Sequence, residues 1–586
     1  MRYSLLAFAL PLAVAGPQGM FQLATFYALP TSTYFFPGYP QNVAFTITSN
    51  LSKATSIVIE SSLLPEHVGW SSVGQPCQGT EPGASIIHCE MSIDTFRGFP
   101  TLSFEIEESL KEPLMITFYA KAYSQEAGSS NTTIVYSAES TIKWKSDSQL
   151  VKESSYFTQR NSSIYPQPRT IKVPALPNAV DERQRLKQAL LWADFHPTGF
   201  YLNPYVPLPV NVSGVSNYGP RPEILVGTPS LIYNHKEDLD RVNHSLVRHE
   251  LNNGKNVIID SNGGIMYIRY VFAADQEKPP PITITLEGGA AAQPIPFFRE
   301  GITTNQEWIH MMINSHVPYV EHAGKHVIIT GHLFDAYPVA YNNGQDQQVL
   351  LNTYKDIIAA QDAISGLNAT ASDSLDRPSP LRPMVVQGSR KRYADSADYR
   401  AAIGAQQVNT QHIWSSFTLE QSWKVWHELG HQRQHTMTWS WSNVTEVTVN
   451  IYSLAASRFF REGKPGLEHG RIAEWESARE YLGGQDKDFD GADHFVQLVM
   501  FEQLRVLFGD EFYHMLHQRS RRARALDTDA DKKHYFMKEA AMIAKMDLAS
   551  FFTTWGLKPE ERTIDAMKSQ PKPKKDYTAT PVFGGH

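Results

Sequence analysis

The residues best suited to chemistry in this sequence are two histidines and a glutamate in the pattern HExxH. His427 and His431 are one helical turn apart, so on a helix their imidazoles lie on one face and can reach the same metal ion. Glu428 lies one step round the helix, where it can reach a water bound to that ion. Downstream, Glu446 offers a carboxylate as a third ligand. Two histidines and one carboxylate leave the fourth tetrahedral position open for water, which is typical of a catalytic zinc site.

Two residues near this motif allow a second interpretation each. His435 lies one turn beyond His431, but three histidines on successive turns span roughly 12 Å, too far for one tetrahedral ion with bonds of about 2 Å. We therefore expect His435 to neighbour the ligands or to lie at the rim of the cleft. Glu446 could instead close a capping box with Asn443 at the start of its own helix. Metal ligation is favoured, because the ion needs a third, anionic ligand.

The spacing excludes one class of zinc protease. A metzincin requires HExxHxxGxxH, but Gln434 and Met437 stand where that pattern needs the glycine and the last histidine. In the remaining arrangement, zinc lowers the pKa of its bound water to about 7 and Glu428 acts as the general base. A further donor to the developing oxyanion is usually needed, and the candidates are Tyr481, His494 and His514.

Helices must hold these ligands in place. Apolar residues around the motif predict a helix, and the capping-box pattern at Thr418–Gln421 predicts that it begins near Thr418. A second helix is predicted from near Asn443 and would carry Glu446. Most of the C-terminal third has helical periodicity, including a basic patch (Arg519, Arg521, Arg522 and Arg524) that we interpret as a solvated helix end.

Upstream of the catalytic region the patterns indicate β structure. Short alternating or apolar runs between turn residues predict an antiparallel β-sandwich. Further strands follow a polar stretch, among them a hairpin over 256–270 with its turn at 261–264. The predicted fold class is multidomain α+β with a mostly helical zincin-like catalytic domain. The predicted divisions are a signal peptide (1–15), the β-sandwich (16–146), a linker (147–180), a β-rich accessory part (181–290), the catalytic domain (291–560) and a polar tail (561–586).

The N-terminus and the cysteines indicate a secreted, extracellular protein. After Arg2, the apolar run Leu5–Ala15 ends in small residues, which is typical of a signal peptide cut near Ala15. In an exported chain we expect the two cysteines, Cys77 and Cys89, to form a local disulfide. Candidate N-glycosylation sequons begin at Asn50, Asn131, Asn161, Asn211, Asn243 and Asn368.

Composition argues against some classes of partner. The 586 residues carry a net charge of -7, which is mild for this length and does not favour nucleic acid or an anionic membrane. No segment is long and apolar enough to predict a transmembrane span.

A second pattern resembles part of a calcium site. Asp486, Asp488 and Asp490, followed by Gly491, match the opening of an EF-hand loop, so structural Ca²⁺ is one hypothesis. The twelfth position is Gln497 rather than the bidentate glutamate, and a polar turn before a helix explains the pattern equally well.

A specific block of residues surrounds the HExxH motif: Trp426–His431, Gln434, Trp439, Thr445–Thr448 and Asn450–Leu454. Segments farther away extend it: Pro197–Tyr201, Gly263–Ile268, Asp547–Leu548, Phe551–Phe552 and Trp555–Gly556. Together they resemble the enhancin-like, mucin-degrading zinc metallopeptidases of peptidase family M60, over about 181–560. The resemblance implies a gluzincin-type endopeptidase, often acting on O-glycosylated or mucin-like proteins. Gln432 departs from the asparagine common in the family, and the loop 399–409 lacks a Gly-Tyr-Pro signature.

These observations predict a secreted zinc endopeptidase acting on O-glycosylated protein. Two alternatives remain open: a metallopeptidase acting on unglycosylated protein, and a non-catalytic glycan-binding protein on the same scaffold. The intact Glu428 argues against the second alternative, because a protein that only binds has no need of a general base.

Overall fold

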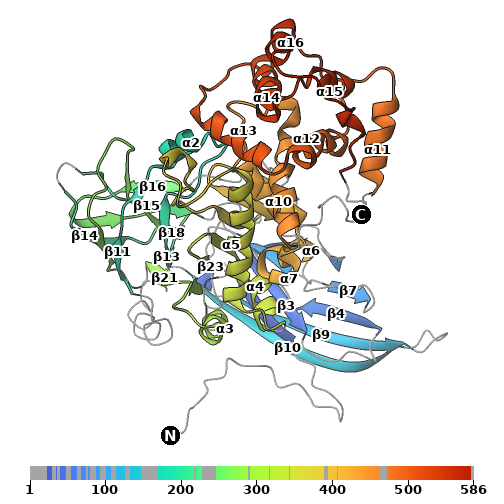
Figure 1. Cartoon of the computed structure of the whole chain (residues 1–586). Helices are drawn as coiled ribbons and strands as arrows, with labels where there is room; N and C mark the ends of the chain where they lie inside the picture. The colour runs from blue at the N-terminus through green and yellow to red at the C-terminus, as the bar shows by residue number, and fades with distance from the viewer. Residues whose placement is uncertain are drawn as a thin grey trace.

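The computed structural model describes residues 168–582, except 217–218, 228–245, 288, 290, 314, 316, 318, 342, 389–393, 405–406 and 461–471, and the strands before residue 147. Residues 1–22, and with them the expected signal peptide, lie outside the described residues. The fold is mixed α/β: Figure 1 shows blue N-terminal strands, a green β-rich part and a mostly helical orange-to-red C-terminal part. Within the described residues, no helix combines the length and apolar character needed to cross a membrane.

The strands before residue 147 are β1 (Leu23–Ala28), β2 (Tyr34–Phe35), β3 (Pro40–Ile47), β4 (Ser56–Ser61), β5 (Val68–Val73), β6 (Cys77–Gln78), β7 (His88–Ser92), β8 (Thr101–Ile106), β9 (Leu114–Gln125) and β10 (Thr132–Ser146). They form two sheets with the orders β1-β3-β8-β5 and β2-β10-β9-β4-β7-β6. Cys77 of β6 is the register partner of Cys89 of β7. Opposed residues of an antiparallel pair are close enough for a disulfide, but the bond itself stays a prediction.

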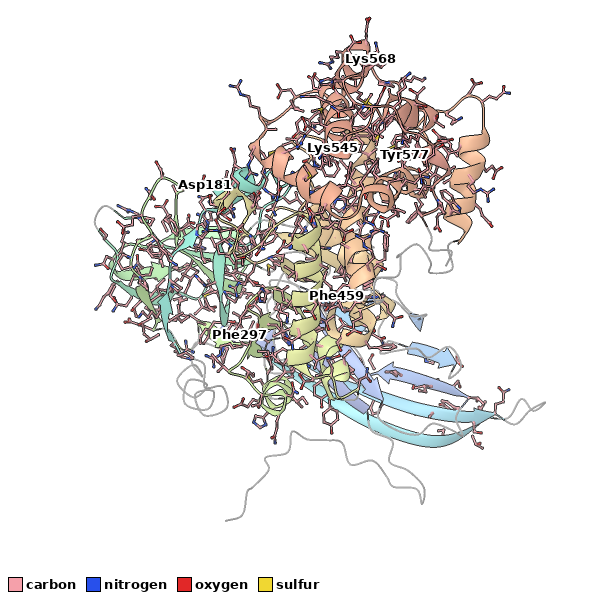
Figure 2. The ribbon with its side chains drawn as sticks, viewed as in Figure 1. Asp181, Phe297, Phe459, Lys545, Lys568 and Tyr577 are labelled. Atoms are coloured by element: carbon pink, nitrogen blue, oxygen red, sulfur yellow. The ribbon has the colours of Figure 1, made fainter. Side chains whose placement is uncertain are left out.

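The β-rich part contains β11 (Thr170–Val173), β12 (Leu176–Pro177), α2 (Ala179–Leu186), β13 (Phe195–Leu202), β14 (Leu208–Ser213), β15 (Glu223–Gly227), β16 (Val247–Glu250), β17 (Gly254–Ile258), β18 (Gly264–Arg269), β19 (Val271–Phe272), β20 (Ile282–Leu286) and β21 (Ala292–Pro294). Its two larger sheets have the orders β11-β20-β14-β17 and β16-β15-β18-β13-β21. Helix α2 contacts the turn after β19 through Asp181, labelled in Figure 2, whose carboxylate accepts a hydrogen bond from the backbone N of Ala274 (2.9 Å). Because β11 pairs with β20, the end of the expected linker over 147–180 is part of the fold.

The predicted hairpin over 256–270 is wrong. β17 pairs with β14, whereas β18 pairs with β13 and β15, so the two strands belong to different sheets. At the start of β18 the backbone of Gly264 runs close to that of Gly227 in β15, because a Cβ on Gly264 would lie 2.5 Å from the Cα of Gly227. Only glycine permits this approach of two backbones.

The central sheet of the catalytic region has the order β22-β23-β24-β25-β27-β26. Every residue of β24, β25 and β27, three of the four inner strands, is buried, as expected for strands covered on both faces. Its strands are β22 (Phe297–Arg299), β23 (Tyr319–Ala323), β24 (Ile328–His332), β25 (Met384–Gly388), β26 (Ala394–Ala397) and β27 (Arg400–Gly404).

Helices cover one face of this sheet and the β-rich part covers the other. On the helical side, Tyr354 and Trp426 pack in one core with Val385. On the other side, Tyr267 of β18 packs with Met384 and neighbouring residues. The helices here are α3 (Asn305–Ile313), α4 (Leu333–Tyr341), α5 (Gln347–Ile364), η2 (Ser374–Asp376), α6 (Gln407–Trp414), α7 (Ser416–Leu419) and α8 (Trp423–His431).

The C-terminal part is helical around a large aromatic core that includes Trp439, Trp441 and Trp555. Residues 561–582, expected as a polar tail, belong to this fold: the side-chain amide of Gln503 donates to the backbone oxygens of Thr578 and Thr580, both at 2.8 Å. The elements are η3 (Ser442–Val444), α9 (Thr445–Thr448), α10 (Asn450–Phe460), α11 (Ile472–Gly483), α12 (His494–Phe508), α13 (Glu511–Arg522), α14 (Asp529–Ala544), α15 (Ala549–Thr554), α16 (Glu561–Met567) and η5 (Tyr577–Ala579).

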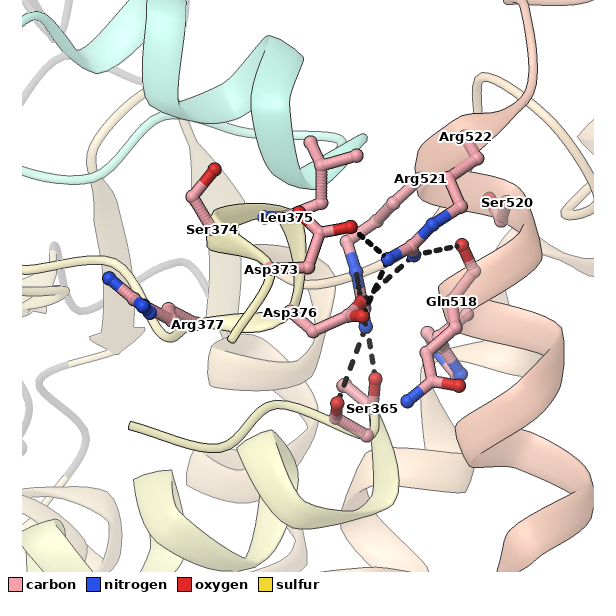
Figure 3. A network of polar contacts seen from close by, with 12 residues as sticks. Ser365, Asp373, Ser374, Leu375, Asp376, Arg377, Gln518, Ser520, Arg521 and Arg522 are labelled. Carbon is pink, nitrogen blue, oxygen red and sulfur yellow. Dashed lines mark hydrogen bonds and ion pairs between the residues drawn. The ribbon is translucent and has the colours of Figure 1, made fainter. Parts of the chain in front are cut away.

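The basic patch on α13 joins the helical part to the loop after α5. Arg521 is buried and donates to the Asp376 carboxylate at 2.7 Å and to the backbone oxygen of Ser365 at 2.9 Å, as Figure 3 shows. Arg522 donates to the other oxygen of Asp376 at 2.7 Å. The interpretation as a solvated helix end is therefore wrong for Arg521, because burial makes its ion pair part of the core.

Candidate metal centre

Helix α8 presents the two histidines on one face, as the HExxH spacing requires. The helix begins at Trp423, where the hydroxyl of Ser422 caps it by accepting from the backbone N of Val425 (3.3 Å). The start predicted near Thr418 is wrong, because Thr418 belongs to the separate short helix α7. Helix α10 packs against α8 and carries Asn450, and the short helix α9 just before it carries Glu446.

Three donor atoms meet between these helices. The Nε2 atoms of His427 and His431 lie 3.0 Å apart, and Oε2 of Glu446 lies 3.1 Å from the first and 3.5 Å from the second. The capping box between Asn443 and Glu446 does not form, since neither η3 nor α9 has a side-chain cap. Glu446 therefore faces the histidines.

The opposite ring nitrogens are held by side-chain amides. His427 Nδ1 lies 2.8 Å from Oδ1 of Asn450, and His431 Nδ1 lies 2.8 Å from Oε1 of Gln434. Both amide groups are oriented by their nitrogens: Asn450 donates to the Glu446 backbone oxygen (2.9 Å), and Gln434 donates to Thr448 Oγ1 (2.9 Å). In each neutral imidazole the proton is therefore on Nδ1. The Nε2 atoms of His427 and His431 then face each other with their lone pairs.

This donor set fits a zinc ion. Ligand atoms bound about 2.0–2.1 Å from a tetrahedral ion lie roughly 3.3–3.4 Å apart, close to the three distances between His427, His431 and Glu446. Two imidazole lone pairs and a carboxylate at such separations repel one another unless a cation lies between them. Within the part of the chain that the structure describes, these residues are the one group of three or more His, Cys, Asp or Glu placed to hold a metal ion.

Electrostatics couple the three residues. When no metal ion is bound and the histidines are protonated at Nε2, hydrogen bonds from His427 and then His431 hold the pKa of the Glu446 carboxyl well below its usual range. Burial lowers the pKa of His431, but the hydrogen bond and charge of Glu446 raise it, and the net shift is upward. Protons and a metal ion thus compete for the same ligand atoms of the histidines and Glu446. The affinity for the metal should therefore fall as the pH falls.

Glu428 lies on the face of α8 that meets the edge strand β26. It is 6% exposed, and its Oε2 atom lies 2.7 Å from the hydroxyl of Ser396. Burial raises the pKa of Glu428, while the hydrogen bond from Ser396 opposes that rise. A raised pKa suits a carboxylate that must take a proton from water and later release it.

His435 is neither at the rim nor beside the ligands. It is buried in the helical part, where Nδ1 lies 2.6 Å from Ser520 Oγ and the ring packs edge-on against His517 at 4.6 Å. Burial lowers its pKa well below the ordinary value. The turn that follows α8 after residue 431 explains the error, because His435 no longer follows the helical period.

Other expected site residues are placed elsewhere. The hydroxyl of Tyr481 donates to the backbone oxygen of Trp555 (2.9 Å), and His514 lies beside Glu511 (3.5 Å). His494 is exposed at the start of α12. None of the three has a described contact with the metal-site residues. The structure therefore supports none of the oxyanion donors that the sequence suggested.

The hypothesis of a calcium site at the aspartates of 486–490 gains no support from the described residues. The described ligand groups do not include Asp486, Asp488 and Asp490 together. The carboxylate of Asp490 accepts from Trp441 Nε1 (2.9 Å) and pairs with Lys533. The alternative of a structural turn before α12 is the better interpretation.

Only two of the candidate sequons fall on described residues. Asn211 in β14 and Asn368 after α5 are both exposed. Asn50, Asn131, Asn161 and Asn243 lie outside the described residues. Glycosylation at any of them stays a prediction.

Comparison with known families decides the classification. Residues 291–556 match the model for peptidase M60, enhancin and enhancin-like, and residues 177–285 match the N-terminal domain of M60-like peptidases. The chain belongs to the M60 peptidase family. Both matched segments together cover the β-rich part, the central sheet and the metal-site helices.

One curated relative resembles the chain in sequence, and solved structures resemble it in fold. TRPM8 channel-associated factor 3 of Rattus norvegicus is 24% identical over 346 residues, which cover 54% of this chain and 34% of the rat protein. The chain therefore spans about a third of that relative's length. A functionally unknown conserved protein of Bacillus anthracis is 26% identical with a TM-score of 0.59, covering 70% of this chain and 81% of the other. The M60 catalytic domain of ZmpC from Clostridium perfringens, in complex with the sialyl T antigen, is 18% identical with a TM-score of 0.57, covering 70% and 81%.

Proposed function

We propose that this protein is a secreted, zinc-dependent endopeptidase that hydrolyses peptide bonds in O-glycosylated or mucin-like proteins. The observation that carries the proposal is the meeting of His427, His431 and Glu446 at 3.0–3.5 Å, with Glu428 on the same helix. Membership of the M60 family supports the peptidase activity.

The chain's own residues account for the proton transfers. A zinc ion held by His427, His431 and Glu446 would polarise the scissile carbonyl and make a nearby water acidic. Glu428 accepts the proton of the attacking water. The same carboxyl then delivers that proton to the leaving amine nitrogen, so the glutamate ends the cycle in its starting state.

The edge strand β26 offers a place for the substrate backbone. Among the described strands it pairs with β27 alone, so an extended substrate segment could be added along its other edge. Because β26 lies beside α8 and contacts Glu428 through Ser396, a peptide extended along it passes the general base. An endopeptidase needs such an open track, since its substrate continues on both sides of the scissile bond.

A glycosylated substrate is supported by the family and by the expected export of the chain. One solved M60 catalytic domain is in complex with the sialyl T antigen. The leader-like segment Leu5–Ala15 would direct this protein to the compartment where such glycoproteins occur. Cleavage of unglycosylated protein is the second candidate, and the loop 399–409, which departs from the family pattern, is the feature that favours it.

Digestion of a panel of O-glycoproteins tests both candidates. Each substrate is offered intact and after enzymatic removal of its O-glycans, with and without a zinc chelator, and products are read by mass spectrometry. The proposal expects cleavage of the intact glycoproteins alone, and none with chelator. Cleavage only after deglycosylation would overturn the glycoprotein assignment in favour of the second candidate.

The variant Glu428→Gln tests the mechanism. It should retain zinc but lose about 10²–10⁴-fold in cleavage rate, because it cannot accept a proton. The exposed Glu480→Gln on α11 is the matched control and should cleave normally. If neither the parent nor Glu428→Gln cleaves any substrate but both bind glycan, the chain is a binding protein.

A further inference from the structure

Ser396 joins the edge strand β26 to the general base. Its Oγ atom lies 2.7 Å from Oε2 and 2.8 Å from the backbone oxygen of Glu428, across 32 residues of sequence. No other described hydrogen bond reaches the Glu428 carboxylate. The contact therefore sets which way the carboxylate points.

The hydroxyl has one proton and two acceptors within reach. When it donates to Oε2 of Glu428, it holds that oxygen against β26 and leaves Oε1 for the water. When Glu428 carries a proton, the Ser396 hydroxyl can turn toward the backbone oxygen and accept from the carboxyl instead. No proton is gained or lost by Ser396, and the carboxyl group keeps its orientation in both states.

Among the surrounding charged groups, Lys424 attracts Glu428 from the preceding turn of α8, but no charged side chain has a described hydrogen bond to the Glu428 carboxylate. Asp395, the next residue of β26, is paired with the buried Arg400 at 3.3 Å. His427 and His431 are oriented toward Asn450, Gln434 and Glu446. Neither the ion pair nor the metal-site histidines restrain the Glu428 side chain through a described hydrogen bond.

We propose that Ser396 is a positioning residue that fixes the catalytic orientation of Glu428 from the strand on which the substrate lies. The inference rests on the proposed function, since it assigns Ser396 a part in the same reaction. It also links substrate docking to catalysis, because any displacement of β26 by a bound peptide is transmitted to the base through one hydrogen bond. Ser396 itself does not touch the reacting atoms.

The test compares Ser396→Ala with Ser396→Thr in the zinc-loaded full chain, using the glycoprotein that the parent cleaves best. Loss of a hydrogen bond to a charged group should lower kcat about 10- to 100-fold in Ser396→Ala, with KM within about two-fold of the parent. Ser396→Thr keeps the hydroxyl and should recover most of kcat. Zinc content and thermal midpoint should not change in either variant. Ser457→Ala, at a buried serine of α10 whose hydroxyl has no described partner, is the control.

A double variant separates positioning from a structural role. In the Glu428→Gln background, Ser396→Ala should lower the residual rate no further, because the group on which Ser396 acts is already gone. An unchanged kcat in Ser396→Ala, a loss explained by missing zinc, or an additive loss in the double variant would overturn the inference. Failure of the parent itself to cleave would instead overturn the proposed function, so the two failures are distinct.

Discussion

Gly430 of α8 lies directly against Val449, at the junction of α9 and α10. A Cβ on Gly430 would lie 2.9 Å from the backbone oxygen and 3.0 Å from Cγ2 of Val449. The absence of a side chain thus lets the second helical segment approach the metal helix. Glu446 precedes Val449 by three residues and Asn450 follows it directly. This close approach brings Glu446 to both histidines and Asn450 to His427.

Gly430→Ala should weaken both the fold and the metal site. The added methyl collides with backbone at Val449, so α10 must move, at a cost of about 1–3 kcal/mol. We expect a lower midpoint in chemical denaturation and weaker zinc binding in a competition assay. Gly483→Ala at the end of α11 is the control, because a Cβ there meets nothing within 4 Å. Equal effects of the two variants would mean that close packing at Gly430 is unimportant.

Asn450→Ala should lower zinc affinity about 10- to 100-fold, the usual effect of removing a residue that orients a histidine ligand. The substitution removes the acceptor for His427 Nδ1 and so frees the ring to rotate. Asn450→Asp keeps an acceptor and should bind zinc nearly as well as the parent. Asn352→Ala, on the exposed side of α5, should have no effect. Affinity is measured by titration against a chromogenic chelator, and an intact affinity in Asn450→Ala would contradict the assigned proton position.

Removal of zinc should destabilise the parent but not a ligand variant. At a free zinc concentration 100 times Kd, binding contributes about 2.7 kcal/mol, so a chelator should lower the thermal midpoint by about 2–3 °C in a chain of this length. His427→Ala should bind little zinc and respond to the chelator hardly at all. His310→Ala, at an exposed histidine of α3, should respond like the parent. A chelator effect that persists in His427→Ala would place the ion elsewhere.

The buried Glu321 should make stability depend on pH. Burial raises its pKa to about 7 from the ordinary value of 4.5, although Tyr267 and Thr330 both donate to its Oε1 atom, at 2.8 and 2.9 Å. Between these values the folded chain holds a proton that the unfolded chain releases. The contribution of Glu321 to the free energy of unfolding is therefore fully present below about pH 4.5, and it is lost as the pH rises through about 7.

Glu321→Gln keeps the acceptor for Tyr267 and cannot ionise. Its thermal midpoint should exceed that of the parent at pH 8, and the difference should shrink toward pH 5. Glu480→Gln, at an exposed glutamate, controls for general charge effects. A difference that stays constant from pH 5 to pH 8 would show that Glu321 does not titrate in this interval.

Much of the metal centre could be predicted from sequence because it is local. The i, i+4 spacing of His427 and His431 survives into α8, and Glu446 needs only the short return through η3. The amide partners had a usable signal as well: Asn450 follows Glu446 by one helical turn, and Gln434 follows His431 by three residues. Ser396 had no such signal, because its contact with Glu428 depends on the pairing of β26 with β27.

The errors share a physical cause, which is that local patterns do not report tertiary partners. The apolar runs on either side of Gly264 resemble a hairpin, yet each pairs with strands far away in the sequence. Arg521 belongs to a basic run that looks solvated, but Asp376 from the loop after α5 neutralises it. His435 was placed by extending a helix that in fact ends at His431.

The contact of Tyr267 with Glu321 bears on how this protein can be divided. This contact lies in the apolar layer where β18 covers the central sheet. Tyr267 belongs to the segment that matches the M60-like N-terminal domain, and Glu321 belongs to the segment that matches peptidase M60. A fragment beginning at residue 291 would leave that face of the sheet in water and should aggregate. The boundary near residue 290 separates two segments that match different parts of the M60 family but not two folding units, so gene fusion or domain shuffling would have to carry both segments together.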